Sequence, residues 1–127
     1  MKLLIDDANI EKIKKIYEFY AVDGVTTNPS ILAKEGRSPY EVLKEIRNFI
    51  GKDAELHVQV ISTHADEMIN EGHIMVEELG ENTYIKIPTI PEGLKAMKIL
   101  SIRRYWKRRR FFWMKWANTK IRFSLFP

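Results

Sequence analysis

The 127-residue sequence contains no cysteine, which excludes disulfide bonds and metal sites built on thiolates. Long apolar runs are lacking as well. The first such run, Leu3 to Ile5, is too short for the hydrophobic region of a signal peptide or for a membrane span. We therefore expect an intracellular, soluble protein of the cytoplasm. The length allows one domain, although it is about half of what a complete (β/α)₈ barrel needs.

Acidic residues are missing from the last part of the chain. Residues 101–127 contain nine Lys and Arg but no Asp or Glu, a charge of +9, whereas residues 1–100 contain twelve basic and seventeen acidic residues, a charge of −5. Eight of the fourteen aromatic residues also lie in 101–127. The composition therefore divides the chain into a domain at 1–100 and a basic, aromatic tail at 101–127.

Apolar runs alternate with amphipathic segments over the first hundred residues. We expect strands at 2–6, 23–27, 56–61 and 83–87, and helices at 9–20, 28–50 with a break near Gly36, 63–79 and 91–100. Strands separated by helices in this way are typical of parallel βα units. Four such units form either a small open α/β sheet or half of a (β/α)₈ barrel, and periodicity does not decide between them.

A polar side chain marks the end of each predicted strand. These residues are Asp6 on the first strand, Thr26 and Asn28 on the second, Gln59 on the third and Lys86 on the fourth. In both architectures functional residues gather at the carboxyl ends of the strands. Burial of Lys86 among apolar neighbours favours the neutral amine, which attack on a ketone requires. Together with a carboxylate, a hydroxyl and amides, it suits proton transfers around a carbinolamine and an enamine.

Each of these residues also has an ordinary structural interpretation. Lys86 alone is compatible with an edge lysine whose stem packs while its ammonium group reaches solvent. Asp6 is compatible with capping of the next helix, and the segment 26–30 with turn and cap chemistry. Gln59 is compatible with a hydrogen bond to a neighbouring backbone group. None of these alternatives explains why the polar groups would converge at one end of the sheet.

The segment Gly24-Val25-Thr26-Thr27-Asn28-Pro29-Ser30-Ile31 is similar to the most recognisable motif of the transaldolase family. The segment Ile85-Lys86-Ile87-Pro88, followed by Glu92-Gly93-Leu94, is similar to the Schiff-base lysine segment of the same family. Leu3-Leu4-Ile5-Asp6 resembles the first strand of the family and Val58-Gln59-Val60 its third. The likeness covers residues 1 to about 100 and is strongest for the short branch that includes fructose-6-phosphate aldolase. It implies an α/β fold, the first half of a (β/α)₈ TIM barrel.

The resemblance also implies a role for each strand-end residue. Lys86 would be the catalytic nucleophile that forms a Schiff base with the C2 carbonyl of a ketose, and Asp6 would assist proton transfer at the sugar hydroxyls. Thr26 and Asn28 would hold the hydroxyls of the dihydroxyacetone unit, and Gln59 would help to position the catalytic water.

The family reaction is a transferase step of the pentose phosphate pathway on sugar-phosphate substrates. A three-carbon ketol unit moves from sedoheptulose 7-phosphate to glyceraldehyde 3-phosphate, whereas the aldolase branch releases free dihydroxyacetone. The resemblance implies no metal and no organic cofactor, and it implies homo-oligomers for complete members. His57, His64 and His73 form no H-E-x-x-H pattern, and we interpret them as surface residues.

The likeness stops after Leu100. A family member would continue with a fifth strand and three more βα units, which carry a tyrosine near the catalytic water and an arginine and a serine for the substrate phosphate. We interpret 101–127 instead as frameshifted or truncated sequence, so that the first and fourth strands are open edges and catalysis is weak or absent. The alternative is a non-catalytic basic module that binds nucleic acid or an anionic membrane through residues 101–127.

Overall fold

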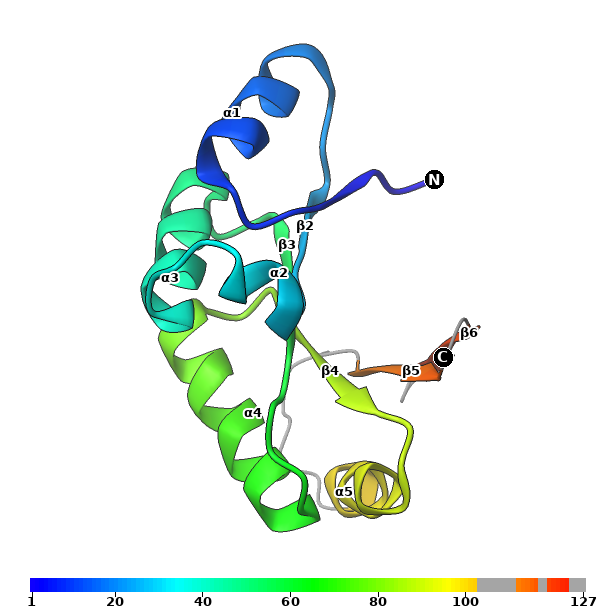
Figure 1. Cartoon of the computed structure of the whole chain (residues 1–127). Helices are drawn as coiled ribbons and strands as arrows, with labels where there is room; N and C mark the ends of the chain where they lie inside the picture. Colours follow the sequence, from blue (N-terminus) through cyan, green and yellow to red (C-terminus); the bar gives the residue numbers. More distant parts are fainter. Residues whose placement is uncertain (103–111, 117–118, 124–127) are drawn as a thin grey trace.

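The computed structural model describes residues 1–102, 112–116 and 119–123 (Figure 1). The elements in chain order are β1 (Leu4–Asp6), α1 (Ile10–Phe19), β2 (Gly24–Thr26), α2 (Pro29–Ala33), α3 (Pro39–Ile50), β3 (Glu55–Gln59), α4 (Ala65–Leu79), β4 (Thr83–Pro88), α5 (Pro91–Ile102), β5 (Phe112–Trp116) and β6 (Thr119–Phe123). All four strands expected in the first hundred residues are present. The helix expected at 28–50 is divided into α2 and α3 around Gly36, whose φ of 64° suits glycine.

Side-chain caps and glycines set where the helices begin and end. The Asn9 side chain accepts a hydrogen bond from the Lys12 amide at 3.1 Å and thereby starts α1. Asn28 caps α2 in the same way, and Pro29 follows at the first helical position. Gly51 ends α3 with a φ of 80°, so the chain turns directly into β3.

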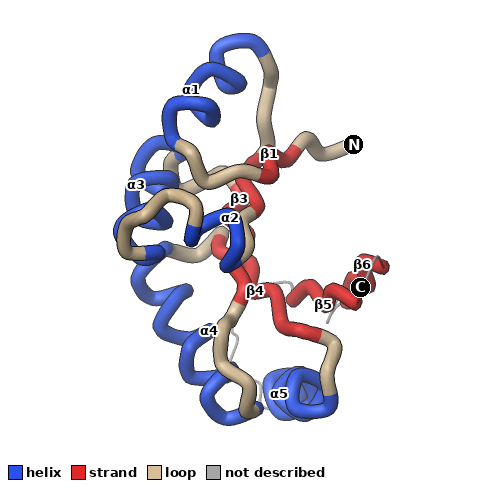
Figure 2. Tube along the Cα trace, viewed as in Figure 1, coloured by secondary structure: helices blue, strands red, loops and turns tan. Residues whose placement is uncertain are grey.

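The first four strands pair in parallel and in sequence order (Figure 2). In the register, Asp6 pairs with Thr26, Thr26 with His57 and His57 with Tyr84. Each crossover contains a helix, so the expected α/β fold, consistent with the first half of a TIM barrel, is confirmed.

The expectation that the fourth strand is an open edge is wrong. The backbone of β5 pairs with β4 in parallel, and β6 continues the sheet in antiparallel orientation, giving the order β1-β2-β3-β4-β5-β6. An unpaired strand edge offers hydrogen-bonding groups to any extended segment, and the aromatic sequence of β5 favours extension. Most of what we expected of the tail concerns residues 103–111, 117–118 and 124–127, which lie outside the described ones.

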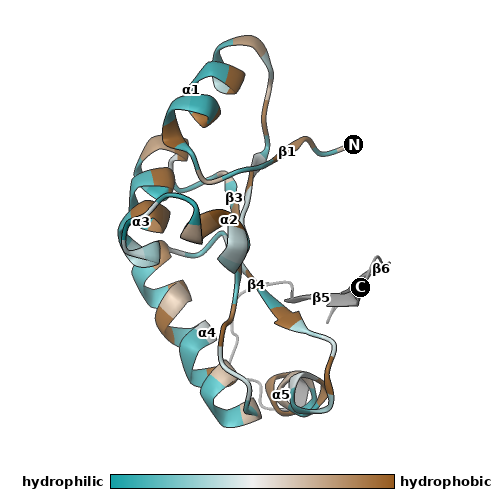
Figure 3. Ribbon diagram, viewed as in Figure 1, coloured by the Kyte–Doolittle hydropathy of each residue, from teal (hydrophilic) through white to brown (hydrophobic). Residues whose placement is uncertain are grey.

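The two faces of the sheet have opposite character. Helices α1, α3 and α4 lie along one side of the strands, and hydrophobic positions recur along them (Figures 1 and 3). The strand residues that face these helices are at most 7% exposed: Ile5, Val25, Leu56, Val58, Ile85 and Ile87. Because side chains alternate along a strand, the residues between them point to the other face, which we call the inner face. Packing of these apolar residues against the helices therefore determines which strand residues lie on the inner face.

Candidate functional site

Every strand-end residue expected to act in catalysis or binding lies on or directly after the strand that was expected to carry it. Asp6, Thr26 and Gln59 are the last residues of β1, β2 and β3, and Lys86 lies on β4 two residues before its end. Asn28 follows β2 by two residues. Since the strands are parallel, these positions share the carboxyl end of the sheet.

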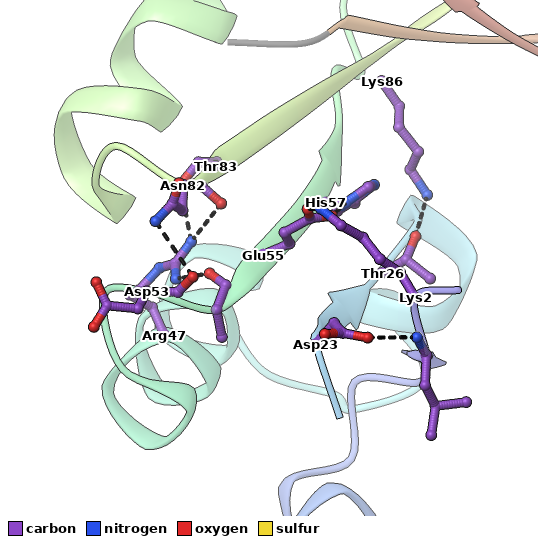
Figure 4. Close-up of polar contacts among 12 residues, drawn as sticks. Lys2, Asp23, Thr26, Arg47, Asp53, Glu55, His57, Asn82, Thr83 and Lys86 are labelled. Atoms are coloured by element: carbon purple, nitrogen blue, oxygen red, sulfur yellow. Dashed lines mark hydrogen bonds and ion pairs between the residues drawn. The ribbon is translucent and has the colours of Figure 1, made fainter. Parts of the chain in front are cut away.

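Lys86 reaches across the inner face from β4 to β2. Its Nζ lies 3.2 Å from the Thr26 hydroxyl oxygen and also donates a hydrogen bond to the backbone carbonyl of Thr27 (Figure 4). Lys86 pairs with Gln59, so the strand β3 lies between the lysine and its contacts on β2. The side chain is half-buried and directed inward, which differs from the edge lysine that the sequence also allowed.

The other strand-end residues differ in how firmly they are held. The Asn28 Oδ1 accepts from the Ile31 amide at 2.9 Å, so the cap interpretation is correct for this oxygen, while the side-chain NH₂ is a separate donor. Asp6 does not cap α1, because Asn9 occupies that position. Among the described residues, none forms a hydrogen bond or ion pair with the exposed Asp6 carboxylate. The Asp6 carboxylate at the carboxyl end is therefore held less firmly than the capping oxygen of Asn28.

Two carboxylates hold the loops that surround this end. Glu71 on α4 accepts hydrogen bonds from the Ile61 and Ser62 amides at 3.0 Å and from the Ser62 hydroxyl at 2.7 Å. Glu92 in the first turn of α5 accepts from the Ala65 amide at 2.9 Å, at the start of α4. The β3–α4 loop beside Gln59 is thereby tied to two helices.

The interpretation of His57 as a surface residue is wrong. It is only 4% exposed, because it lies in the middle of β3 on the inner face between Thr26 and Tyr84. Its ring stacks on Tyr84 with centroids 4.8 Å apart, and its Nε2 lies 3.0 Å from a carboxylate oxygen of Glu55. His64 is exposed as expected, and His73 is partly buried.

The signal for His57 was present in the sequence. Glu55, His57 and Gln59 alternate with Leu56 and Val58, which is the period of a strand with one apolar and one polar face. A polar face opposite a helix-covered face places all three side chains on the inner side.

A charged chain runs along the inner face below Lys86. Lys2 forms an ion pair with Glu55 across β2, where Gly24 has no side chain to obstruct the path. A methyl group on Gly24 would lie 2.1 Å from the Glu55 carbonyl oxygen, so these strands approach too closely for any other residue. Figure 4 shows Lys2, Glu55, His57 and Lys86 gathered over β2, β3 and β4.

The pKa values along this chain are shifted in directions that keep His57 neutral and Glu55 charged. Burial lowers the pKa of His57, and the nearby positive charges of Lys86 and Lys2 lower it further against the pull of Glu55. Burial raises the pKa of Glu55, but hydrogen bonds from Lys2 and His57 outweigh it, so that the pKa lies below its ordinary value. The inner face therefore holds a carboxylate and a neutral imidazole under the lysine.

The amino ends of the strands contain a different kind of network. Arg47 on α3 donates to the carbonyl oxygens of Gly51 and Ala54, both at 2.8 Å, and to that of Asn82 at 3.0 Å. The Asn82 side chain in turn donates to the Lys52 carbonyl at 2.8 Å. Burial lowers the pKa of Arg47. Since the acceptors of Arg47 are backbone atoms of two separate loops, no sequence pattern indicates this network.

Neither a metal site nor a membrane span is visible in the part of the chain that the structure describes. Its His, Asp and Glu residues nowhere form a group of three suited to a metal ion. None of its helices combines the length and the apolar composition that crossing a bilayer requires.

Residues 3–104 match the sequence model of the family described as Transaldolase/Fructose-6-phosphate aldolase. The chain is 47% identical over 98 residues to a probable transaldolase of Leptospira biflexa, an alignment that covers 77% of this chain and 44% of the relative. Against a probable transaldolase of Aquifex aeolicus the identity is 48% over 97 residues, which is 76% of this chain and 43% of the relative. A probable transaldolase of Methanococcus maripaludis is 48% identical over 101 residues, which is 80% of this chain and 46% of the relative. The chain thus spans less than half the length of these relatives.

Proposed function

Because the chain belongs to the transaldolase/fructose-6-phosphate aldolase family, we propose that it handles the dihydroxyacetone unit of sugar phosphates through a Schiff base on Lys86. The observation that carries this proposal is the path of Lys86 across the inner face to Thr26 and Thr27. An inward amine at the carboxyl end of a parallel sheet, with a hydroxyl beside it, is the arrangement that a ketone-binding lysine needs.

In the proposed reaction, the neutral Lys86 amine attacks the C2 carbonyl of the ketose, and loss of water leaves an iminium ion. The iminium withdraws electrons, so the bond between C3 and C4 breaks and an enamine of dihydroxyacetone remains on the lysine. Asp6 takes and returns the proton of the sugar hydroxyl during this step. Asp6 pairs with Thr26 on the neighbouring strand, which supports a shared substrate.

The hydroxyl of Thr26 and the NH₂ group of Asn28 would bind the hydroxyls of the dihydroxyacetone unit. Both residues belong to the end of β2, and capping of α2 fixes the Asn28 side chain in place before substrate arrives. Gln59 pairs with Lys86 on the adjacent strand and would orient the water that is released and taken up again. A rigid scaffold for these groups lowers the entropy lost when the substrate is positioned.

Transaldolase and aldolase activity differ in the fate of the enamine. In a transaldolase it attacks an aldose phosphate such as glyceraldehyde 3-phosphate, whereas in an aldolase it takes a proton and dihydroxyacetone is released. We propose the transferase reaction of the pentose phosphate pathway, in the cytoplasm, since the relatives named above are described as probable transaldolases. Product analysis with and without an added aldose phosphate distinguishes the two.

We further propose that residues 101–127 are not part of the family unit and that turnover is weak as a consequence. The family match ends at residue 104, and the charge of the chain changes sign at residue 101. Translation of the DNA after codon 100 in the other two frames tests this: further βα units in one of them would support a frameshift. If neither frame encodes them, the frameshift is ruled out.

The experiment that tests the Schiff base is reductive trapping. The full chain is incubated with dihydroxyacetone and borohydride, and the adduct is located by peptide mass spectrometry. We expect the label on Lys86 and no label at this position in Lys86→Arg, which keeps the positive charge but has no amine that becomes neutral. An unlabelled Lys86 in a folded chain would rule out the proposed chemistry.

A further inference from the structure

The inner face contains a buried acid–base pair that the proposed roles of the strand-end residues do not use. Glu55 and His57 both lie on β3, two residues apart, and their side chains meet at 3.0 Å. Glu55 is 9% and His57 4% exposed. The barrel interior beneath a carboxyl-end site is usually filled by bulky apolar side chains, so a carboxylate paired with an imidazole here calls for a function.

The hydrogen bond fixes which nitrogen of His57 carries the proton. A charged Glu55 carboxylate only accepts hydrogen bonds, so Nε2 must be the donor and Nδ1 of the neutral ring is left as an acceptor. A carboxylate that holds an imidazole in one tautomer is the arrangement by which proteins prepare a histidine to take up a proton. Stacking on Tyr84 fixes the plane of the ring as well.

The register places this imidazole under the lysine. Lys86 starts on β4 opposite Gln59 and ends at Thr26 on β2, and His57 pairs with Thr26 from the intervening strand. The side chain of Lys86 must therefore cross the inner face of β3 next to His57. At this position the positive charge of Lys86 lowers the pKa of His57, in addition to the lowering caused by burial.

Among the described residues, charged and titratable groups lie near His57 on several strands. Lys2 lies before β1, Asp6 on β1 is level with Thr26, Glu55 is on β3, and Tyr84 and Lys86 are on β4. Strand β2 contributes only Gly24 and Thr26 to this face. Of these groups, only Lys86 must lose a proton before it reacts.

We propose that His57, oriented by Glu55, is the proton acceptor for Lys86 during Schiff-base formation, directly or through one water molecule. This inference rests on the proposed function of Lys86. In the step, an N–H bond of the Lys86 ammonium breaks and the proton binds Nδ1 of His57, while the nitrogen pair forms the bond to C2 and the carbonyl pair moves to oxygen. After a proton shift gives the carbinolamine, His57 returns its proton to the hydroxyl, which leaves as water. The lysine ends as an iminium ion and His57 as a neutral ring.

An internal acceptor has a measurable consequence. When the proton stays within the pair, the reaction rate of Lys86 does not depend on pH between the titration of His57 and that of the lysine. A lysine without such a partner loses about tenfold in rate for each pH unit below its own titration. His57→Phe keeps an aromatic ring on Tyr84 and removes the proton acceptor. In this variant the rate of Lys86 should therefore decline as the pH falls, as it does for a lysine without a partner.

The test measures reductive methylation of the full chain by formaldehyde and cyanoborohydride, with site-resolved mass spectrometry from pH 7 to pH 9. Exposed Lys52 serves as the internal reference. We expect a nearly constant rate at Lys86 in the wild type, a decline of about tenfold per pH unit in His57→Phe, and the same decline at Lys52 in both. Glu55→Gln should show an intermediate loss, and His64→Phe, at an exposed position, should behave as the wild type.

Two results would overturn the inference: a wild-type Lys86 rate that declines as that of Lys52, or a constant rate that persists in both His57→Phe and Glu55→Gln. Circular dichroism of each variant reports whether it is folded. If His57→Phe does not fold, the Glu55→Gln variant tests the inference instead. Formaldehyde needs no sugar site. A missing dihydroxyacetone adduct would therefore contradict the proposed function, whereas an unchanged formaldehyde profile would contradict only the role of His57.

Discussion

The two ends of the parallel sheet use polar residues in opposite ways. At the amino end, Arg47 donates three hydrogen bonds of 2.8–3.0 Å to backbone carbonyls and has no acidic partner among them. At the carboxyl end, the Nζ of Lys86 lies 3.2 Å from the Thr26 hydroxyl and donates to the Thr27 carbonyl, and Asp6 is exposed. Arg47 therefore holds backbone carbonyls of the fold, whereas Lys86 and Asp6 lie where the proposed substrate would bind. We expect the amino end to contribute mainly to stability and the carboxyl end to the proposed chemistry.

The largest expected effect is on chemistry at the carboxyl end. Lys86→Met should abolish reductive trapping at this position, a loss of about a thousandfold or more, because no other nitrogen occupies the place of the amine. The free energy of unfolding should change by less than about 1 kcal/mol, since a half-buried lysine is exchanged for a side chain of similar length. Trapping and chemical denaturation of the same preparation check both parts. A large loss of stability would show that Lys86 belongs to the structural network instead.

The reverse effect is expected at the amino end. Arg47→Ala should lower the free energy of unfolding by about 2–4 kcal/mol, because three backbone carbonyl groups, two of them partly buried, lose their donor at once. The rate of trapping at Lys86, measured below the unfolding transition, should stay within about twofold. The matched control is Arg37→Ala, which removes an exposed arginine paired with Glu45 and should change stability by less than about 1 kcal/mol. Equal destabilisation by both variants would contradict a specific stabilising role for the Arg47 hydrogen bonds.

Two adjacent threonines at the end of β2 allow the same contrast between stability and chemistry to be tested within one strand. The Thr26 hydroxyl contacts Lys86 at 3.2 Å, whereas the buried Thr27 hydroxyl donates to the His57 carbonyl at 3.0 Å. Thr26→Val should reduce trapping about tenfold with little effect on stability, as expected for loss of one hydrogen bond to the reacting group. Thr27→Val should lower stability by about 1 kcal/mol and leave trapping nearly intact, because the contact of Lys86 is to the Thr27 backbone. Trapping kinetics and denaturation curves of both variants test these expectations. Identical behaviour of the two variants would contradict separate roles for Thr26 and Thr27.

The smallest expected effect is a loss of stability in acid that begins with His57. The folded protein holds the pKa of His57 below its ordinary value of 6.5, so the unfolded chain binds the proton more readily and stability declines as the pH falls below about 6.5. The lowered pKa of Glu55 acts in the same direction below about 4.5, where its carboxylate is protonated on unfolding. Denaturation curves between pH 7 and pH 4 measure both contributions. His57→Phe should remove the part that begins as the pH falls below about 6.5; an unchanged curve would contradict a buried neutral imidazole.

Residues at the carboxyl end were predictable from the sequence because each one interrupts an apolar strand. Lys86 stands between Ile85 and Ile87, and Thr26 follows Val25, so the pattern alone marked both as exceptions. Resemblance to a family then gave them an order and a role. The fold followed from the same pattern, because apolar runs separated by amphipathic helices admit few arrangements other than parallel βα units.

The groups that the sequence did not reveal are those whose partners lie far away along the chain. Arg47 binds carbonyls of residues 51, 54 and 82, and backbone carbonyls have no signature in a sequence. The alternation of His57 with Leu56 and Val58 indicates the inner face, but its burial there depends on Glu55 beside it and on Tyr84 of the neighbouring strand. The pairing of β5 with β4 depends on an unpaired edge, which becomes visible only once the sheet is assembled.

The most direct test of the account compares trapping by dihydroxyacetone and borohydride at Lys86 and at exposed Lys52, in native buffer and in concentrated urea. Folding is what brings Lys86 to Thr26 and over His57, so its reactivity should depend on the folded sheet. We predict strong preference for Lys86 in native buffer, at least about tenfold over Lys52, and a ratio close to one in urea. A ratio close to one under both conditions would contradict the claim that the carboxyl end of this sheet forms a site for a Schiff-base lysine.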